Sequence, residues 1–174
     1  MTRGRFITLE GGEGGGKSTQ VFRLAERFRR IGYDVVATRE PGGAEGAEVI
    51  RKLLVAGEPG RWDAVTELLL HFAARRDHLR RTVWPALDRG QWVISDRFAD
   101  STMAYQGYGH GLGRGPVEAV YRLVVGEFKP DLTLILDLPV AEGLGRANAR
   151  GGDNRYEQMD QAFHERLRQG FLDI

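Results

Sequence analysis

A glycine-rich loop between a short apolar run and an amphipathic segment constrains this chain most. The loop, Gly11-Gly12-Glu13-Gly14-Gly15-Gly16-Lys17-Ser18, satisfies the pattern G-x-x-x-x-G-K-[ST] in full. Residues 6–10 before it read as a strand, and residues 17–31 after it read as a helix that Gly32 stops. Glycines let successive N–H groups turn toward one anion, and a helix N-terminus adds positive potential there. Motif and context together predict a nucleoside triphosphate site.

Two side chains of this loop suit a triphosphate. Lys17 can reach the β- and γ-phosphates, and the Ser18 hydroxyl can ligate Mg²⁺. Only three of the 25 basic residues are lysines, so the placement of Lys17 is informative. The loop alone does not choose between a kinase, an ATPase and a GTPase. A GTPase needs an Asn-Lys-x-Asp segment, which the sequence lacks, whereas Asp96 and Asp137 after apolar runs keep an ATPase possible.

Short apolar runs alternate with helix-like segments along the whole chain. Strands are expected at 6–10, 35–38, 92–95 and 132–136, and helices at 17–31, 44–55, 63–87, 116–128, 141–149 and from 160 onward. Pro85 is expected to bend or end the long third helix. Continuous apolar strands indicate burial on both faces, as in a parallel sheet covered by helices. We therefore expect one α/β domain over residues 1–174, with ligands at the carboxyl ends of the strands.

Composition excludes several other classes of protein. The chain has 174 residues, enough for one domain, with 41% apolar and 28% charged residues, which is ordinary for a globular protein. A net charge of +1 gives no strong field for nucleic acid or an anionic membrane. The lack of cysteine excludes disulfide scaffolds and thiolate metal sites. No apolar run approaches the ~18 residues of a membrane span, so we expect no membrane partner and a cytoplasmic location.

Polar residues after the third strand suggest a second site. Asp96 can hold Mg²⁺ directly or through water and Arg97 can clamp a phosphate, although a strand-end ion pair is the simpler alternative. The segment 101–107 follows with a hydroxyl, a phenol and an amide, or forms an ordinary loop or helix start. On the long helix, Phe72 and Arg75 can stack on a base and bond its carbonyl oxygen, or belong to the core and a solvated face.

A third group of basic residues lies near the C-terminal end. Arg146, Arg150 and Arg155 flank Gly151-Gly152-Asp153-Asn154. A mobile lid around 141–157 could close these arginines over a transferring phosphoryl group, stabilise its charge and exclude water. The alternative is an exposed basic helix end.

Taken together, these segments resemble the bacterial form of the thymidylate kinase family. The matching signatures are 10–19, Thr38-Arg39-Glu40-Pro41-Gly42-Gly43, Phe72-Ala73-Ala74-Arg75, Asp96-Arg97-Phe98, Ser101 through Tyr105-Gln106-Gly107, Lys129-Pro130-Asp131-Leu132-Thr133-Leu134 and Arg155-Tyr156-Glu157. They run in family order along nearly the whole chain. The phosphate loop is generic, but the combination is specific.

The resemblance implies a P-loop kinase fold, a parallel sheet flanked by helices on both faces. It also implies ATP-dependent phosphorylation of dTMP to dTDP with Mg²⁺, in a homodimer. By position, Arg75 and Gln106 would read the thymine edge, Arg97 would hold the dTMP phosphate, and Tyr105 would crowd the 2′ position. Glu40 would lie with Asp96 at the phosphate–metal centre.

The resemblance then gives each group of site residues. The expected ATP-binding residues are Gly11, Gly12, Glu13, Gly14, Gly15, Gly16, Lys17, Ser18 and Thr19. The expected substrate-binding residues are Glu40, Phe72, Arg75, Arg97, Ser101, Tyr105 and Gln106. The expected catalytic residues are Lys17, Arg97, Arg146, Arg150 and Arg155, and the expected metal ligands are Ser18 and Asp96.

The sequence departs from the family pattern in two places. The stacking aromatic usually precedes the base-reading arginine by four residues, which here is His71, so His71 and Phe72 are both candidates. The chain stops at Ile174 within a helix-like segment, where relatives continue through another strand and helix that include an adenine-contacting loop. We therefore expect an exposed sheet edge.

The phosphate loop carries Glu13-Gly14 without an arginine, which resembles the class that supplies arginines from the lid.

Two alternative functions stay open from the sequence. Another P-loop phosphotransferase would prefer a different nucleotide or nucleoside, which a substrate panel distinguishes. A non-catalytic nucleotide-binding module would bind ATP without forming ADP when dTMP is added.

Overall fold

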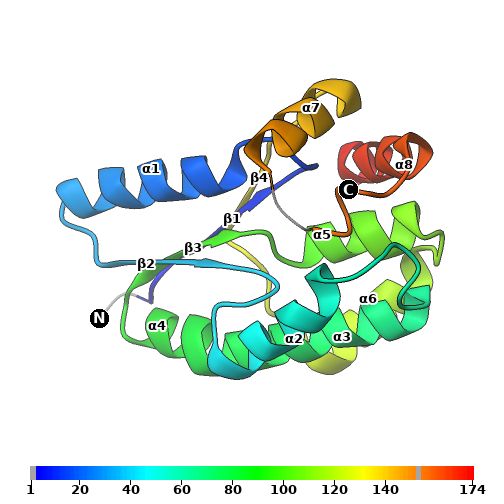
Figure 1. Ribbon diagram of the computed structural model, residues 1–174. Coiled ribbons are helices and arrows are strands. Elements are labelled where there is room, and N and C mark those ends of the chain that lie inside the picture. Colours follow the sequence, from blue (N-terminus) through cyan, green and yellow to red (C-terminus); the bar gives the residue numbers. More distant parts are fainter. Residues whose placement is uncertain (1–2, 152–153) are drawn as a thin grey trace.

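The computed structural model describes residues 3–151 and 154–174 (Figure 1). Within these residues, strands β1 (Phe6–Glu10), β2 (Val35–Arg39), β3 (Trp92–Asp96) and β4 (Leu132–Ile135) form one sheet. Its order is β2-β3-β1-β4 and every pair is parallel. This confirms the predicted α/β class.

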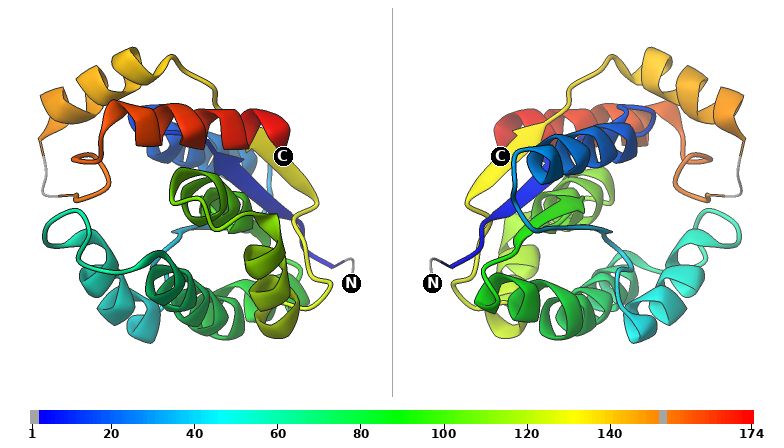
Figure 2. Two further views of the ribbon diagram at one scale, coloured as in Figure 1. Left: turned by 90° about the vertical axis from the view of Figure 1, so that its right-hand side faces the viewer. Right: turned by 90° about the vertical axis from the view of Figure 1, so that its left-hand side faces the viewer.

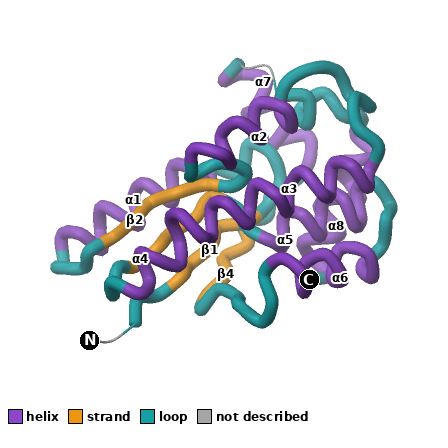
Figure 3. Tube along the Cα trace, turned by 90° about the horizontal axis from the view of Figure 1, so that it is seen from below, coloured by secondary structure: helices purple, strands orange, loops and turns teal. Residues whose placement is uncertain are grey.

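Helices cover both faces of the sheet. They are α1 (Lys17–Arg30), α2 (Glu45–Val55), α3 (Ala64–His78), α4 (Trp84–Asp88), α5 (Ala99–Thr102), α6 (Arg114–Val124), α7 (Val140–Arg150) and α8 (Gln161–Asp173). Two π-helical segments, η1 (Leu79–Val83) and η2 (Met103–Gly109), continue α3 and α5. In Figure 1, α1 and α7 lie above the sheet, and α2, α3 and α4 lie below it. Figure 3 shows the strands from the side that α3 and α4 cover.

Most elements begin and end within a few residues of the predicted bounds. The long third helix is divided, since α3 ends at His78, η1 follows, and α4 begins at Trp84. Pro85 lies in the first turn of α4, where a missing N–H is tolerated. The segment 101–107 is helical, which agrees with the helix start that the sequence left open, since α5 runs directly into η2.

Alternate residues of the central strands supply two separate cores. Phe6 and Val93 pack with Leu68 and Phe72 of α3 on one face of the sheet. Ile7, Leu9 and Ile94 pack with Val21 and Ala25 of α1 on the other face. A third cluster joins η2 to α8 through Tyr105, Phe163 and Leu167. Burial of apolar area on both faces fixes β1 and β3 at the centre of the domain.

The edge strand β4 differs from the predicted burial on both faces. Leu132, Leu134 and Ile135 are 40 to 49% exposed. The reason is its position, because β4 pairs with β1 on one side and no described strand pairs with its other side. None of the helices in the described part of the chain is both long enough and apolar enough to cross a membrane.

Register places the predicted site residues together. Leu9 pairs with Asp96, and Arg39 pairs with Asp96 from the opposite side. The phosphate loop, Glu40 and Arg97 therefore all leave the sheet at the same edge, where ligands bind in open α/β folds.

Two glycines of α7 offer a test of how tightly this helix is held against the phosphate loop. A Cβ built on Gly143 would lie 2.5 Å from the backbone oxygen of Glu13, whereas a Cβ on Gly145 meets no atom within 4 Å. Gly145→Ala should raise the free energy of unfolding by about 0.5–1 kcal/mol, because alanine favours a helix interior. Gly143→Ala should lower it by about 1 kcal/mol or more, because backbone cannot swing aside. Urea denaturation measures both, and equal gains in the two variants would contradict the close packing.

Candidate active site

The phosphate loop curves around the N-terminus of α1. Gly14 has φ 68°, and a Cβ there would lie 2.0 Å from the Gly143 backbone oxygen, so only glycine fits. Gly16, with φ 80°, is the N-cap of α1, and among the described residues no side chain caps this end. The amides of the first turn are thus left for an anion. The Lys17 Nζ atom donates to the Gly12 carbonyl at 2.6 Å, so it lies folded over the loop.

A cleft of about 350 Å³ opens beside this loop. Its walls come from the loop, from α2 and α3, from α5 and η2, and from α7. Figure 2 shows α7 on one side of this region and α2 on the other. The predicted site residues that line it are Glu13, Gly14, Gly15, Gly16, Lys17, Ser18, Thr19, Glu40, Arg75, Asp96, Arg97, Ser101, Tyr105, Gln106, Arg146 and Arg150.

Arg97 connects the loop with the opposite wall. Its Nη1 donates to the Gly11 carbonyl at 2.8 Å and to the Ser101 Oγ at 3.0 Å, and its Nη2 donates to the Tyr105 hydroxyl at 2.9 Å. Glu13 accepts from Arg97 Nη2 at 3.2 Å and from the Tyr105 hydroxyl at 2.5 Å. Arg97 is also the only non-glycine with positive φ among the described residues, at 73°. Such strain persists where neighbouring bonds hold a functional side chain in place.

Burial shifts the pKa values of Lys17, which lines the cleft, and of Glu10, which is not among the residues that line it. Burial, together with the charge of Arg97, lowers the pKa of Lys17 to about 8. Burial raises the pKa of Glu10 to about 7, against hydrogen bonds that it accepts from Ser101 and from the amide of Phe98. Burial is the largest cause of both shifts, and it disfavours the charged form of each group.

A buried wall beyond Arg97 presents two polar atoms without partners. Arg75 donates from Nε to Glu40 at 2.7 Å and from Nη2 to the Phe98 carbonyl and the Thr102 hydroxyl, both at 2.9 Å. Its Nη1 has no partner among the described residues. The Gln106 Nε2 donates to Glu67 at 2.7 Å, and its Oε1 likewise has no partner there. The cleft thus offers one free donor and one free acceptor.

The two candidate stacking rings lie at different depths. Phe72 is 1% exposed, belongs to the core and lies 4.7 Å under the Arg75 guanidinium, so it does not line the cleft. His71 lines the cleft and its Nε2 lies 2.9 Å from the Tyr156 hydroxyl. Burial lowers the pKa of His71 to about 4, so the ring is neutral at pH 7. Of the two, His71 is the ring available to a base.

The three lid arginines also differ. Arg146 and Arg150 of α7 line the cleft and are 57% and 63% exposed, with surface partners in Glu142 and Glu157. Arg155 is instead fully buried, donates to the Leu54 carbonyl at 2.6 Å and pairs with Glu67. The structure therefore does not bring Arg155 into the lining of the cleft, and its expected catalytic role stays a prediction. Gly152 and Asp153 lie outside the described residues.

Gly11 and Gly12 also lie away from the cleft lining. They border a smaller cavity of about 20 Å³ between the loop, α7 and α8. Their contribution to the site is made through backbone carbonyls, which accept from Arg97 and Lys17.

Ser18 and Asp96 offer a place for a hard cation. The Ser18 hydroxyl donates to the Asp96 carboxylate across the ends of the loop and β3. Magnesium in phosphate-transfer sites takes one or two protein oxygens and fills its other positions with phosphate and water. These two oxygens fit that pattern.

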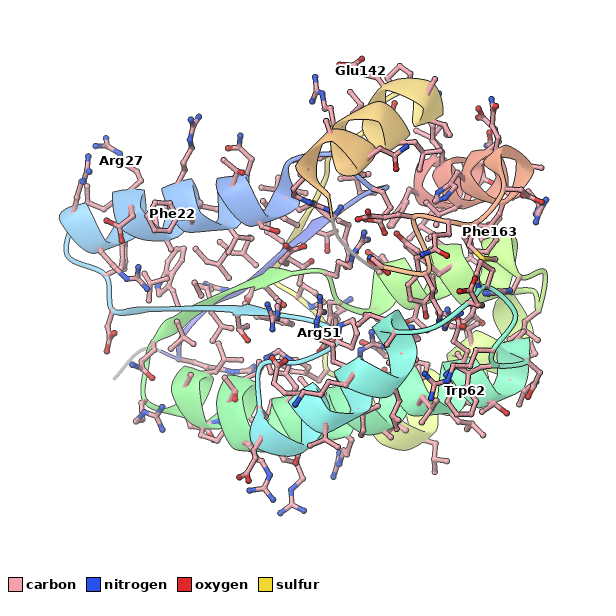
Figure 4. All side chains as sticks on the ribbon, viewed as in Figure 1. Phe22, Arg27, Arg51, Trp62, Glu142 and Phe163 are labelled. Carbon is pink, nitrogen blue, oxygen red and sulfur yellow. The ribbon has the colours of Figure 1, made fainter. Side chains whose placement is uncertain are left out.

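Sequence reasoning missed Arg51, which lines the cleft from α2. Its Nη1 donates to the Pro41 carbonyl at 2.7 Å, and Figure 4 shows the side chain between α2 and the sheet. The spacing held a signal, since Arg51 follows Ala47 by four residues and precedes Leu54 by three, and both are fully buried. An arginine on the buried face of a helix indicates a partner or a ligand.

A parallel sheet with a phosphate loop, a second cationic site beside it and a buried polar wall defines the chain as a P-loop nucleotide kinase. The family model for thymidylate kinase matches residues 9–174. The chain belongs to the thymidylate kinase family.

Individual relatives agree with the family match. The thymidylate kinase of Caulobacter vibrioides is 58% identical over all of this chain and 84% of that protein. That of Ruegeria pomeroyi is 52% identical over 98% of this chain and 81% of that protein. The crystal structure of thymidylate kinase from Ehrlichia chaffeensis superposes with a TM-score of 0.81 at 38% identity, covering 98% of this chain and 86% of that one.

Proton uptake on ATP binding tests the environment of Lys17. At pH 8.5 this side chain is largely neutral, because its pKa is lowered to about 8. A triphosphate raises that pKa, so binding should take up on the order of half a proton at pH 8.5 and the Lys17 share should vanish near pH 7. Calorimetry in buffers of different ionisation enthalpy measures the uptake. Lys17→Met should lose it, and an unchanged uptake in that variant would assign it to another group.

Proposed function

We propose how the residues of this cleft carry out the reaction of the family. The chain phosphorylates dTMP to dTDP, with ATP as phosphate donor and Mg²⁺ as cofactor. The loop binds the ATP phosphates, and dTMP lies against the buried wall with its phosphate at Arg97.

The observation that carries this orientation is the pair of free atoms on that wall. Arg75 Nη1 is a donor, and Gln106 Oε1 is an acceptor. Thymine presents the complementary set, an O4 acceptor beside an N3–H donor. Cytosine presents the opposite set at these positions. Leaving buried polar atoms unpaired is costly, so this wall favours thymine.

Glu40 supports the donor on this wall. It is 5% exposed and accepts from Arg75 at 2.7 Å and from His78 at 2.9 Å. Burial alone would raise its pKa, but Arg75 and His78 hold that pKa below its usual value. The ionised carboxylate thus fixes the guanidinium, which leaves Nη1 directed at the base.

Arg97 brings the two phosphates together. Because it already bonds to the loop through Gly11, a dTMP phosphate held by Arg97 lies beside the end of the ATP chain. Ser101 and Tyr105 support its guanidinium, and the Tyr105 ring occupies the space beside it, where a ribose 2′-hydroxyl would be crowded.

The chemistry needs little from the protein beyond position and charge. A phosphate oxygen of dTMP attacks the γ-phosphorus, the bond from that phosphorus to the β,γ-bridging oxygen breaks, and ADP leaves. Lys17 and Arg97 offset the charge of the two anions, and Arg146 and Arg150 add charge from α7. When bound by Ser18 and Asp96, Mg²⁺ supplies further charge neutralisation at the phosphates.

The wider organisation is also a proposal. We expect residues 1–174 to act as one domain in the cytoplasm, with α7 and the segment around 141–157 closing as a lid. The homodimer that the family resemblance implies stays a prediction. Exposed apolar side chains at Val65 and Leu69 of α3 and Leu123 of α6 support it, since α3 packs against α6.

A substrate panel tests the function. ADP release measured with dTMP, dCMP, dGMP and thymidine should be clearly highest with dTMP. Cytosine presents the opposite pair of groups to the wall, and thymidine lacks the phosphate that Arg97 holds. Guanine presents the same acceptor and donor as thymine, so dGMP tests whether the wall also discriminates against the larger purine ring. Lys17→Ala should lower turnover by several orders of magnitude, on the order of 10³-fold or more, with an unchanged unfolding midpoint. ATP binding without ADP release on addition of dTMP would contradict the proposal, as would a preference for another nucleotide.

Arg97→Lys tests the phosphate clamp. Lysine keeps the charge but loses the planar fork, so the KM for dTMP should rise by about 10- to 100-fold while the KM for ATP changes little. Arg168→Lys is the matched control, since Arg168 makes a two-pronged pair with Asp137 outside the cleft. That variant should leave both constants unchanged. A larger effect of Arg97→Lys on ATP than on dTMP would reassign Arg97 to the donor nucleotide.

A further inference from the structure

Gln106 is held from behind by a buried carboxylate. The Gln106 side chain is fully buried, and its Nε2 donates to Glu67 Oε1 at 2.7 Å. A glutamine amide has a donor end and an acceptor end, so fixing one end decides what the other end offers. The partner behind the wall therefore determines which hydrogen-bonding group a base meets in the cleft.

Glu67 accepts hydrogen bonds from Gln106 and Arg155, and His110 lies close to it. Glu67 lies on α3, fully buried and outside the cleft lining. Its Oε2 accepts from Arg155, and its Oε1 lies 3.1 Å from His110 Nε2 as well as beside Gln106. Burial alone would raise its pKa, but bonds from His110 and Arg155 lower the pKa of Glu67 to about 2. An ionised carboxylate only accepts, so Gln106 is obliged to turn its nitrogen toward it.

We propose that Glu67 is a specificity-determining positioning residue, which sets the Gln106 amide so that its oxygen faces the base. The inference rests on the proposed function, in which Gln106 meets the N3 edge of dTMP. With this setting the site accepts from the N3–H of thymine, and it places an oxygen against the N3 lone pair of cytosine.

A purely structural role would look different. In that case Glu67 would serve only to neutralise the buried Arg155, and the orientation of Gln106 would be incidental. The two roles separate in Glu67→Gln, which keeps the shape and removes the charge. The Arg155 guanidinium is charged and buried, so leaving it without an acceptor costs more free energy than leaving Gln106 or His110 without one. We therefore expect the amide oxygen at position 67 to accept from Arg155 in this variant.

This change at position 67 alters the cleft through Gln106. When the amide oxygen at position 67 faces Arg155, the amide nitrogen at the same position faces Gln106 and His110. One hydrogen of that nitrogen faces His110 Nε2, and the other requires that Gln106 turn its own oxygen inward. Its nitrogen then faces the base, and a free donor replaces the free acceptor on the wall.

The experiment compares kcat/KM for dTMP, dCMP and dUMP in the wild type and in E67Q. For dTMP we expect a fall of about 10- to 100-fold, and the dTMP:dCMP ratio should fall by at least about tenfold. The dTMP:dUMP ratio should stay unchanged, because the two bases share the N3–H and O4 edge and differ only in a methyl group. The KM for ATP should also stay unchanged.

Two further variants separate polarity from packing. Glu67→Asp removes a methylene group but still only accepts, so it should lower stability and keep the dTMP:dCMP ratio. The exchange variant E67Q/Q106E restores an acceptor in the cleft, since one oxygen of the new carboxylate accepts from position 67 and the other faces the base. It should recover selectivity that E67Q loses. Thermal unfolding checks the fold of each variant, and if E67Q is too unstable to assay, the exchange variant alone decides.

A wild-type dTMP:dCMP ratio in E67Q would overturn the inference, as would an exchange variant no more selective than E67Q or, where E67Q cannot be assayed, less selective than the wild type. Equal loss of activity in E67D and E67Q with the ratio intact would leave Glu67 as a partner of Arg155 alone. Failure of the wild type to phosphorylate dTMP would instead contradict the proposed function, so the two failures are distinguishable.

Discussion

The parallel pairing of β1 with β3 is the constraint on which the cleft depends. Leu9 is in register with Asp96, so the phosphate loop and Arg97 leave neighbouring strands at the same edge. The strained backbone of Arg97, costing on the order of 1–3 kcal/mol, is held because its N–H donates to the Leu9 carbonyl at 2.9 Å and its carbonyl accepts from Ser95 at 2.7 Å. The sheet therefore sets the separation between the phosphate loop and Arg97, which in the proposed function is the separation between the two phosphates.

Neighbouring acceptors also offset the positive charges of Arg97 and Lys17. Glu13 accepts from Arg97 and Tyr105, and the Lys17 ammonium lies on the Gly12 carbonyl. Burial alone would raise the pKa of Glu13, but Arg97 and Lys17 hold it below its usual value. Glu13 thus acts as an internal anion where phosphates are expected. We expect the phosphates of a bound nucleotide to replace Glu13 as the partner of these cations, and so to raise the pKa of Lys17.

The sequence predicts the order of strands and helices and the chemistry of the loop well, since both follow from local patterns. It also predicts most cleft residues, because they follow strand ends. It does not predict how deeply a side chain is buried, and for several site residues burial decides whether the side chain can reach a ligand. Phe72 and His71 are adjacent, yet the helix turns one into the core and the other toward the cleft. The burial of Arg155 depends on Glu67, 88 positions earlier, a contact that no spacing rule reveals. Arg51 was missed because its partner is a backbone carbonyl of another segment.

The arginines of this region differ in burial, and we expect their contributions to differ with it. Arg75 and Arg155 are buried and paired with Glu40 and Glu67, so their charges are already compensated and they act through direction rather than net charge. The Arg97 side chain is 14% exposed and shares its partners, and in the proposed function it exchanges them for a phosphate. The arginines of α7 are exposed, and solvent screens their charge until closure removes water. In the proposed function, Arg75 therefore acts in recognition of the base, Arg155 acts only through Glu67, and the exposed arginines of α7 add charge at the phosphates. Substitutions of the buried arginines should change which nucleotide is chosen, and substitutions of the exposed ones should change how fast it reacts.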